Sequence, residues 1–594
     1  MTSGHADRLV SLRKVLAEAG LNGFIVPRAD EHLGEYVPES AERLQFISGF
    51  TGSAGLAIVL ADRAAVFSDG RYTLQLAEQT DPALWERHHI IEEKPELWLQ
   101  SHAAGSRVGY DPWLISADGL KKYEGVGVVL VPVTANPIDA IWAERPAPPM
   151  HPAVPHPEAF TGEPSTAKRA RLGQALREAG QDVAILSDPA ALAWLFNIRG
   201  GDVEFTPIAL GYALLRADGT ATLFMPAAKL PAETRAHLGN AVELAEREAL
   251  PAALDALRGK TVRYDPASMP VWFKTRLEAA GAAIAEAPDP VALPRALKNV
   301  VEQSGARAAQ LRDGAAVTRF LAWFAQAAPT GAETEISAAE RLLAARAQEA
   351  HFRGESFPAI SGAGEHGAIM HYRVTPESNR AVKPNEFYLI DSGAQYLDGT
   401  TDITRTLWTG PDEPPAEAKD RYTRVLAGHI ALAQAVFPVG IAGAFLDTLA
   451  RAALWQAGLD YDHGTGHGIG SYLSVHEGPA GIARTSKTVP LAPGMILSNE
   501  PGYYLNGGYG IRLENLILVE PADFGPQPRK FLRFETITLA PFERRLIEPA
   551  LLSAAALGWL NAYHATVREQ LTPLLPTAEQ HWLEQATAPI YHRK

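Results

Sequence analysis

Four carboxylates and one histidine in the last third of the chain stand where strand-like runs end or turn, and together they could hold divalent metal ions. An acidic side chain that closes an apolar strand costs free energy unless it is paired or binds a cation. One such acid is an ordinary structural hydrogen-bonder, but four of them beside a glycine-flanked histidine favour a metal site. These residues are Asp391, Asp402, His467, Glu500 and Glu514.

The number of these donors indicates two ions rather than one. Carboxylates and an imidazole are ligands that Mn²⁺, Co²⁺ and Zn²⁺ accept. A single cation could not use so many anionic ligands, whereas two cations about 3.5–4 Å apart can share bridging carboxylates. The chain has no cysteine, so thiolate metal sites, disulfides and cysteine nucleophiles are excluded.

The histidine of this set lies in the stretch YDHGTGHGIG, residues 461–470, where His463 precedes His467 by four positions. Two histidines at this spacing can bind a metal from a helix, but glycine at every even position from 464 to 470 disfavours a helix. We therefore predict an extended strand or bulge, in which glycine lets the backbone crowd a site. Other motifs fail: the glycine spacing does not fit G-x-G-x-x-G, H-E-x-x-H is absent, and TGSAG at 51–55 lacks the first glycine of a nucleophile elbow.

The elements that must position these residues fall into three predicted domains. A proline-rich strip, residues 145–160, separates two similar patterns of helix, glycine and apolar strand, which begin at Leu12 and Leu172. Near residue 300 a long helical periodicity begins, and strand-like runs then alternate with helices. We predict two related α/β domains with mixed sheets, residues 1–150 and 160–300, and a larger C-terminal α+β domain, residues 301–594, that ends in a helical extension.

Composition is that of a globular protein with 594 residues, of which 46% are hydrophobic and 21% charged. The net charge is −14 and no basic cluster follows a nucleic-acid backbone, so we expect no nucleic-acid partner. No apolar run reaches the roughly 20 residues that span a bilayer, and the N-terminus reads as a charged amphipathic helix rather than a signal peptide. We therefore expect a cytoplasmic protein without a membrane partner.

Five separated segments resemble, in residue and in order, the pita-bread metallopeptidases, the family of methionine aminopeptidase, prolidase, aminopeptidase P and creatinase. These segments are AIMHYRV, YLIDSGAQYLDGTTDITRT, HGTGHGIGSYLSVHEGP, LSNEPGYY and GYGIRLEN. Over nearly its whole length the chain is similar to the three-domain Xaa-Pro aminopeptidases (aminopeptidase P). RLQFISGFTGSAG and FSDGRYTLQ resemble their first domain, and FNIRGGDVEFTP the second. The resemblance implies two creatinase-N-like domains followed by a pita-bread catalytic domain.

The resemblance also implies how the five donors share two metal ions. Asp402 and Glu514 would bridge the ions, Asp391 would bind one of them, and His467 with Glu500 would bind the other. Glu500 would in addition accept the proton of the attacking water and pass it to the leaving nitrogen.

Five further residues receive roles from the same resemblance. His371 and His476 would contact the substrate and stabilise the tetrahedral intermediate, with His463 near the substrate. Arg512 would support the metal-bound carboxylates, and Arg71 would reach the peptide from the first domain.

The implied enzyme is a metal-dependent hydrolase that releases the N-terminal residue from peptides with proline in the second position, through a hydroxide that bridges two metal ions. Mn²⁺ is the expected metal, with Zn²⁺ or Co²⁺ as alternatives, and a homodimer is expected from the family. Two other readings remain open: a prolidase-like dipeptidase and a non-enzymatic pita-bread binding protein. A creatinase-like hydrolase needs no metal, so the complete ligand set argues against it.

Overall fold

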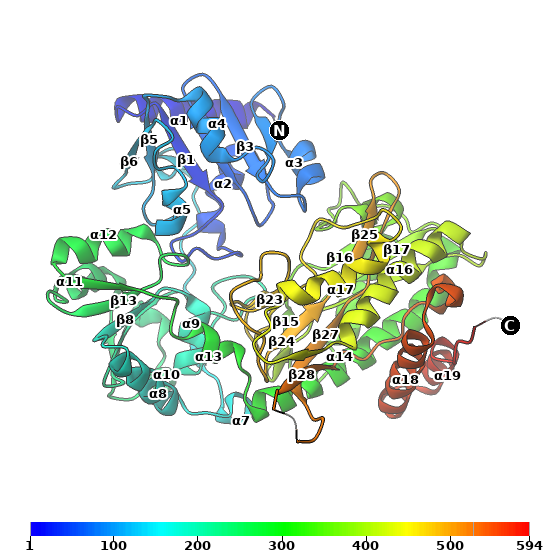
Figure 1. Cartoon of the computed structure of the whole chain (residues 1–594). Coiled ribbons are helices and arrows are strands. Elements are labelled where there is room, and N and C mark those ends of the chain that lie inside the picture. Colours follow the sequence, from blue (N-terminus) through cyan, green and yellow to red (C-terminus); the bar gives the residue numbers. More distant parts are fainter. Residues whose placement is uncertain (1, 527, 593–594) are drawn as a thin grey trace. The chain divides into compact units, whose positions relative to one another are not determined.

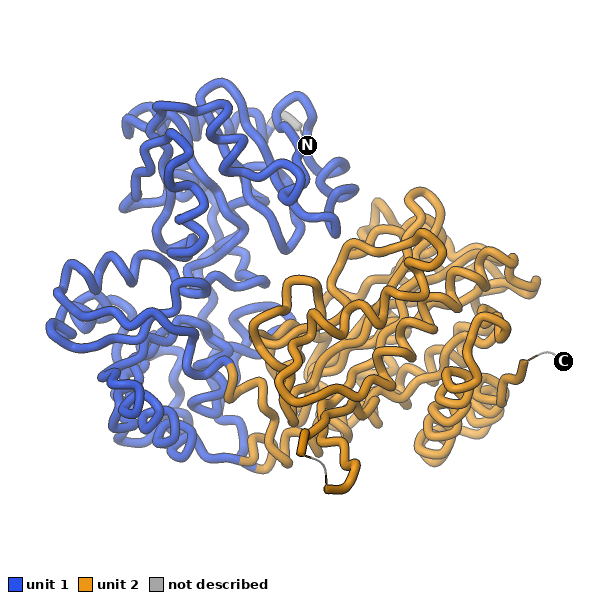
Figure 2. Tube along the Cα trace, in the orientation of Figure 1, with its two compact units in different colours: residues 1–158, 163–292 blue, residues 159–162, 293–594 orange. Residues whose placement is uncertain are grey.

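The computed structural model describes residues 2–526 and 528–592, and the chain divides into two compact units (Figures 1 and 2). Unit 1 consists of residues 1–158 and 163–292, and unit 2 of residues 159–162 and 293–594. Among the described residues, no helix has both the length and the apolar character needed to cross a membrane.

Unit 1 contains two six-stranded sheets with the same topology. The first has the order β4-β3-β2-β1-β5-β6 and the second β12-β11-β10-β8-β13-β14. In each sheet the second, third and fourth strands of this order pair antiparallel with one another, and all other neighbouring strands pair parallel. The predicted pair of related α/β folds with mixed sheets is therefore confirmed. The strands are β1 (Gly23–Pro27), β2 (Leu56–Leu60), β3 (Ala64–Ser68), β4 (Glu86–His89), β5 (Arg107–Tyr110) and β6 (Val129–Pro132), then β8 (Val183–Leu186), β10 (Tyr212–Arg216), β11 (Ala221–Phe224), β12 (Val242–Ala245), β13 (Thr261–Tyr264) and β14 (Ala283–Glu286).

In each sheet the first strand follows a helix that stops at a glycine. α1 (Thr2–Glu18) is followed by Gly20 and α8 (Ser165–Glu178) by Gly180, and both glycines have the positive φ of a left-handed helix end. The other helices of unit 1 are α2 (Arg43–Ser48), α3 (Thr73–Gln79), α4 (Pro95–His102), α5 (Ala117–Lys121), α6 (Pro137–Ile141), α9 (Pro189–Phe196), α10 (Ala232–Leu238), α11 (Leu250–Asp255) and α12 (Val271–Ala280); a short ladder joins β7 (Val154–Pro155) to β9 (Ile198–Arg199).

Unit 2 is built from long helices packed on several small antiparallel sheets. Its first long helix, α14 (Val300–Ala327), begins with a capping box in which Asn299 and Glu302 satisfy each other's backbone donors. A second long helix, α16 (Ala416–Ala433), ends shortly before β21 (Val436–Pro438). The remaining helices are α7 (Glu158–Thr161), α13 (Ala292–Ala296), α15 (Glu335–Arg346), α17 (Ala444–Trp455), α18 (Ala554–Leu571) and α19 (Thr577–Ala586).

Two of these sheets carry the predicted site residues. One has the order β16-β17-β20 and the other β21-β28-β27-β24, and the ladders β22-β23 and β25-β26 complete the surroundings. The strands of unit 2 are β15 (Phe352–Glu355), β16 (Ile360–Ala363), β17 (Phe387–Ser392), β18 (Ala394–Tyr396), β19 (Gly399–Thr400), β20 (Ile403–Trp408), β21 (Val436–Pro438), β22 (Gly466–His467), β23 (Gly481–Ile482), β24 (Ile496–Asn499), β25 (Gly502–Leu505), β26 (Tyr509–Arg512), β27 (Asn515–Ala522) and β28 (Phe531–Thr536).

Candidate metal centre

The first two carboxylates are brought together by one antiparallel strand pair. Asp391 lies in β17 and stands opposite Thr404 of β20. Asp402 precedes β20 by one residue, so the turn into that strand returns it to the same end of the pair. Both side chains are buried.

The two glutamates meet in the same way at the end of another strand pair. β24 and β27 are antiparallel, with Asn499 opposite Asn515. Glu500 directly follows Asn499 and Glu514 directly precedes Asn515, so the two acids flank this terminal pair. These two antiparallel pairings place four acids from distant parts of the sequence at neighbouring strand ends.

Backbone hydrogen bonds connect these strand ends to each other and to the glycine-rich stretch. The amide of Glu514 donates to the carbonyl oxygen of Thr404 at 3.1 Å, which joins the two strand pairs. The amide of Glu500 donates to the carbonyl oxygen of Thr465 at 2.8 Å, two residues before His467. All five predicted donors therefore belong to one hydrogen-bonded framework within unit 2.

The side chains converge on one point. His467 Nε2 lies 3.4 Å from Asp402 Oδ2 and 3.4 Å from Glu500 Oε1. One ligand atom each from Asp402, His467 and Glu514 lie within 4.8 Å of one another. His467 Nδ1 lies 3.0 Å from the carbonyl oxygen of Gly468, and this contact directs Nε2 toward the carboxylates.

The charges of this cluster are poorly compensated by protein groups alone. Burial raises the pKa of Asp391 and of Glu500, the latter to about 7, and raises the pKa of Glu514 well above its ordinary value. Burial acts to lower the pKa of His467, but the hydrogen bond with Asp402 and the charge of Glu500 outweigh it and raise this pKa to about 9. Such clustered, desolvated acids are stabilised as anions by bound cations.

Two buried carboxylate oxygens of this cluster are available to bind metal ions. Asp391 Oδ1 and Glu514 Oε1 are buried and have no hydrogen-bond partner among the described residues. Oxygen donors with one imidazole match the preferences of divalent ions of the Mn²⁺, Co²⁺ and Zn²⁺ kind. The residues present thus fit divalent cations.

Neighbouring side chains hold the other carboxylate oxygens. Arg512 donates to Asp391 Oδ2 at 2.7 Å, and Thr404 Oγ1 donates to Glu514 Oε2 at 2.7 Å. Ser498 Oγ donates to Glu500 Oε1 at 3.1 Å. Hydrogen bonds of this kind orient metal ligands and fix which oxygen faces the ion.

The two histidines of the glycine-rich stretch have different neighbours. His463 Nε2 lies 2.9 Å from the hydroxyl of Tyr504, whose oxygen also accepts a hydrogen bond from Arg512 at 2.7 Å. The ring of His467 meets the ring of His476 edge-on at 4.2 Å. His467 therefore faces the carboxylates, whereas His463 contacts Tyr504.

The predicted extended backbone of the glycine-rich stretch is confirmed. Gly466 and His467 form β22, and a Cβ atom on Gly466 would lie 2.0 Å from the carbonyl oxygen of Ser498. A Cβ atom on Gly468 would lie 2.1 Å from the carbonyl oxygen of Glu477. No side chain fits in either place, so glycine at these positions allows the backbone to pack directly behind His467.

The two other predicted substrate residues lie on other segments of the chain. His371 is half-buried in a turn after the short helix η5 (Gly364–Ala368) of unit 2. Arg71 belongs to unit 1, where its guanidinium forms a bidentate pair with Asp69, with a shortest distance of 2.8 Å. The contact of Arg71 with a peptide remains a prediction.

Comparison with known proteins follows the same division of the chain. Residues 8–141 and 144–302 match models of the creatinase/prolidase N-terminal domain, residues 304–521 match metallopeptidase family M24, and residues 530–590 match the C-terminal region of that family. An aminopeptidase P2 of Arabidopsis thaliana is 38% identical, over 98% of this chain and 88% of the relative. The chain belongs to metallopeptidase family M24.

Two further M24 relatives span the whole chain. A probable Xaa-Pro aminopeptidase P of Aspergillus flavus is 40% identical, over 99% of this chain and 93% of the relative. The crystal structure of an X-prolyl aminopeptidase from Caenorhabditis elegans, described as a cytosolic enzyme with a di-nuclear active site, superposes with a TM-score of 0.93 at 32% identity. It covers 99% of this chain and 100% of its own. The predicted family and fold class are confirmed by these matches.

Three supporting residues of the M24 site escaped the sequence analysis: Thr404, Ser498 and Tyr504. For Tyr504 a signal was present, because the turn around 506–508 closes a hairpin in which Gly502 stands opposite Arg512. Alternation along a strand then puts Tyr504 on the same face as Gly502, next to Arg512. Thr404 and Ser498 carried no comparable signal, because serine and threonine are common in strands of any function.

Proposed function

We propose that this chain is a metal-dependent Xaa-Pro aminopeptidase, which releases the first residue from peptides with proline in the second position. The observation that carries the proposal is the meeting of four carboxylates at the ends of two strand pairs with the imidazole of His467, in a chain whose full-length relatives are named aminopeptidases. The described site has no feature that favours either alternative function, a prolidase-like dipeptidase or a non-enzymatic binding protein.

The proposed ligands divide between two ions. Asp402 and Glu514 would lie between the ions, Asp391 would bind one of them, and His467 with Glu500 would bind the other. When bound, divalent ions of this kind lower the pKa of a water molecule and polarise the scissile carbonyl group. Arg512 holds the second oxygen of Asp391 and leaves its unpartnered oxygen available.

The remaining chemistry belongs to protein side chains. Glu500 would take a proton from the attacking water and deliver it to the leaving nitrogen, which is the usual work of a buried general base. His371 and His476 would donate hydrogen bonds to the substrate and to the oxyanion that develops on its carbonyl oxygen. A peptide bond to proline has no N–H group, so recognition must use the ring and the carbonyl groups.

Four finer features are part of the proposal. Mn²⁺ is the proposed metal, with Zn²⁺ or Co²⁺ as alternatives, since the donors accept all three. A cytoplasmic location is supported by the cytosolic description of the C. elegans relative. Peptides are the proposed partners, without nucleic acid or membrane. Three domains, residues 1–150, 160–300 and 301–594, are proposed with support from the ranges of the family models.

The proposed activity predicts how short proline peptides are cleaved. Arg-Pro-Pro should lose only its arginine, and Arg-Ala-Ala should remain intact because alanine leaves the proline site unfilled. A chelator should abolish the cleavage, and Mn²⁺ should restore it better than Zn²⁺ or Co²⁺. Mass spectrometry of the products checks all three expectations. Cleavage of the dipeptide Arg-Pro without cleavage of the tripeptide would instead indicate a dipeptidase, and no cleavage at full metal content would exclude the proposed function.

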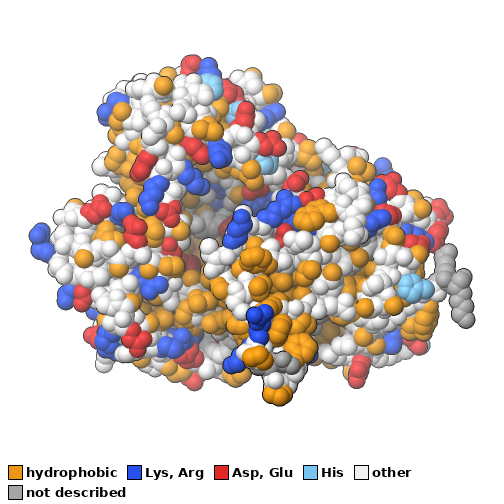
Figure 3. All heavy atoms as spheres, viewed as in Figure 1, with side chains coloured by type: hydrophobic (Ala, Val, Ile, Leu, Met, Phe, Trp, Pro, Cys, Tyr) orange, Lys and Arg blue, Asp and Glu red, His pale blue; other side chains and the backbone are white. Residues whose placement is uncertain are grey.

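A homodimer is proposed on the family's expectation and on an apolar surface of unit 2. Phe445 and Leu449, one helical turn apart on α17, are 68% and 37% exposed, and Trp455 at its end is 43% exposed. Hydrophobic side chains gather on this visible face of unit 2 (Figure 3). Large exposed apolar patches commonly mark protein interfaces.

This surface predicts the effect of introducing charge. Phe445→Glu combined with Leu449→Glu should convert a dimer to a monomer in light scattering, because a charge would be buried without a partner. Leu574→Glu, at an exposed leucine 44% accessible in the C-terminal extension, should leave the mass unchanged. A wild-type protein that is monomeric at micromolar concentration would contradict the proposal.

A further inference from the structure

Glu335 is a fully buried carboxylate that belongs to unit 2 but not to the metal centre. It is the first residue of α15, whose N-cap is Thr334, and its side chain has no exposed surface. The positive end of a helix dipole favours an anion at this position. A buried carboxylate nevertheless costs free energy unless its oxygens are hydrogen-bonded, so its partners indicate what it does.

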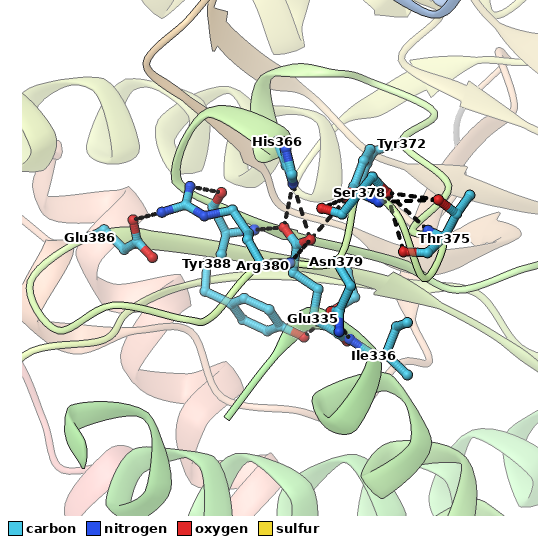
Figure 4. A network of polar contacts seen from close by, with 12 residues as sticks. Glu335, Ile336, His366, Tyr372, Thr375, Ser378, Asn379, Arg380, Glu386 and Tyr388 are labelled. Atoms are coloured by element: carbon cyan, nitrogen blue, oxygen red, sulfur yellow. Dashed lines mark hydrogen bonds and ion pairs between the residues drawn. The ribbon is translucent and has the colours of Figure 1, made fainter. Parts of the chain in front are cut away.

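The partners of Glu335 all come from one segment of the chain (Figure 4). Oε1 accepts from the amide of Ala363 at 2.8 Å and lies 2.8 Å from His366 Nδ1. Oε2 accepts from the hydroxyl of Tyr372 at 2.9 Å and from the amide of Arg380 at 3.3 Å. One carboxylate thus joins the beginning, the middle and the end of the segment 363–380.

This segment has little regular structure of its own. After η5, residues 369–380 form turns and irregular backbone without a strand ladder. A second contact from α15 also reaches it, because the amide of Ile336 donates to Asn379 Oδ1 at 3.1 Å. Irregular segments are ordinarily mobile, so these hydrogen bonds from α15 contribute to fixing its shape.

The segment also packs against the strand that carries Arg512. A Cβ atom on Gly510 would lie 1.7 Å from the carbonyl oxygen of Gly367, so the two backbones are in direct contact. Gly510 precedes Arg512 by two residues in β26, and Arg512 donates to the metal-type ligand Asp391. The segment therefore contacts both Glu335 and the strand that carries Arg512.

His371 is the residue directly before Tyr372 in this segment. The ring of Tyr372 packs on the ring of His366 with centroids 4.5 Å apart, and both side chains point toward the carboxylate of Glu335 (Figure 4). The position of the Tyr372 hydroxyl consequently fixes the backbone from which His371 projects.

We propose that Glu335 is a positioning residue for His371: its carboxylate sets the geometry of the segment 363–380 and thereby places the His371 ring for the substrate. This inference rests on the proposed function, in which His371 contacts the peptide. Small displacements of a contacting group are costly, since a shift of about 1 Å can lower a rate by about 10²-fold.

The donors around Glu335 require a carboxylate rather than an amide. Each oxygen accepts from a backbone amide, so a glutamine would have to direct its NH₂ group at either the Ala363 amide or the Arg380 amide, neither of which can accept. Glu335→Gln therefore keeps the size of the side chain but breaks one half of the network. This substitution therefore tests the hydrogen bonding of Glu335 without changing its size.

The first measurement concerns the segment itself and does not depend on activity. Hydrogen exchange followed by mass spectrometry should show faster exchange over residues 363–380 in Glu335→Gln than in wild type, with the rest of unit 2 unchanged. Glu365→Gln is the matched control, because Glu365 is an exposed glutamate of the same segment. Exchange that is unchanged in Glu335→Gln would overturn the anchoring role, whatever the enzyme's activity.

The second measurement is a double-mutant cycle with His371→Ala. Glu335→Gln should lower kcat/KM for Arg-Pro-Pro by about 10- to 100-fold, while metal content stays the same and Glu365→Gln has no effect. In the His371→Ala background, Glu335→Gln should cause little further loss, because it acts through His371. Losses that multiply fully in the double variant would overturn the proposal. If Glu335→Gln fails to fold, Tyr372→Phe replaces it in the same cycle, because it removes the hydroxyl that contacts Glu335 and Ser378. Failure of the wild type to cleave the peptide contradicts the proposed function, and hydrogen exchange then still decides the anchoring.

Discussion

Glu500→Gln is expected to lower kcat by about 10²- to 10⁴-fold, the usual contribution of a positioned general base, while the protein keeps its fold. The backbone of Glu500 is fixed by its hydrogen bond to Thr465, and Oε1 accepts from Ser498, so an amide oxygen can take the same place. The amide cannot accept a proton from water or deliver one to the leaving nitrogen. The loss should therefore appear in kcat for Arg-Pro-Pro rather than in the melting temperature.

The interpretation of this variant depends on its metal content, because Glu500 is also a proposed ligand. Metal analysis by mass spectrometry separates the two roles: two ions bound with a large loss of kcat indicates lost proton transfer, whereas one ion bound indicates lost ligation. Glu520→Gln is a suitable control, since Glu520 lies on the adjacent β27 and pairs with Arg533 at the surface. Near-normal turnover in Glu500→Gln would refute the proposed site.

The elements and donors of the metal centre could be predicted because their signals are local. Gly20 and Gly180 mark helix ends through a positive φ that other residues avoid, so the two related halves of unit 1 are visible in the sequence. Asp391 interrupts an apolar strand, which is expensive in any fold without a partner. Features that violate a local preference in this way are readable from the sequence alone.

What could not be predicted depends on contacts between distant segments. The need for glycine at 466 comes from the carbonyl oxygen of Ser498, which no local pattern reveals. Glu335 reads as an ordinary acid in the first turn of a helix, and only the folded chain shows that four donors from another segment surround it.

Glu514→Gln is expected to have opposite effects on function and on the stability of the metal-free protein. Glu514 is a proposed bridging ligand, and an amide is a much weaker ligand for a divalent ion than a carboxylate. Its amide oxygen can still accept from Thr404 Oγ1, which donates to Glu514 Oε2 at 2.7 Å, so the local backbone should be preserved. Metal analysis should show fewer than two ions per chain, and cleavage of Arg-Pro-Pro should be lost.

The metal-free variant should unfold at a higher temperature than the metal-free wild type at pH 7. Burial, followed by the charges of Asp402 and Glu500, raises the pKa of Glu514 well above its ordinary value of 4.5. As pH rises above that value, the unfolded chain releases this proton while the folded chain keeps it or carries a buried charge, so the stability of the wild type falls with rising pH. Glutamine has no proton to lose and avoids this cost.

Thermal unfolding with a chelator, at pH 5 and at pH 7, measures this difference. The advantage of Glu514→Gln should be small at pH 5, where the unfolded carboxyl group is itself still partly protonated, and larger at pH 7. Addition of Mn²⁺ should reverse the order, because ions that bind only the folded wild type stabilise it by mass action. A metal-free variant that is less stable than the metal-free wild type at pH 7 would mean that the Glu514 carboxylate stabilises the fold rather than destabilising it. We therefore expect the buried charges of this site to destabilise the folded protein unless cations are bound.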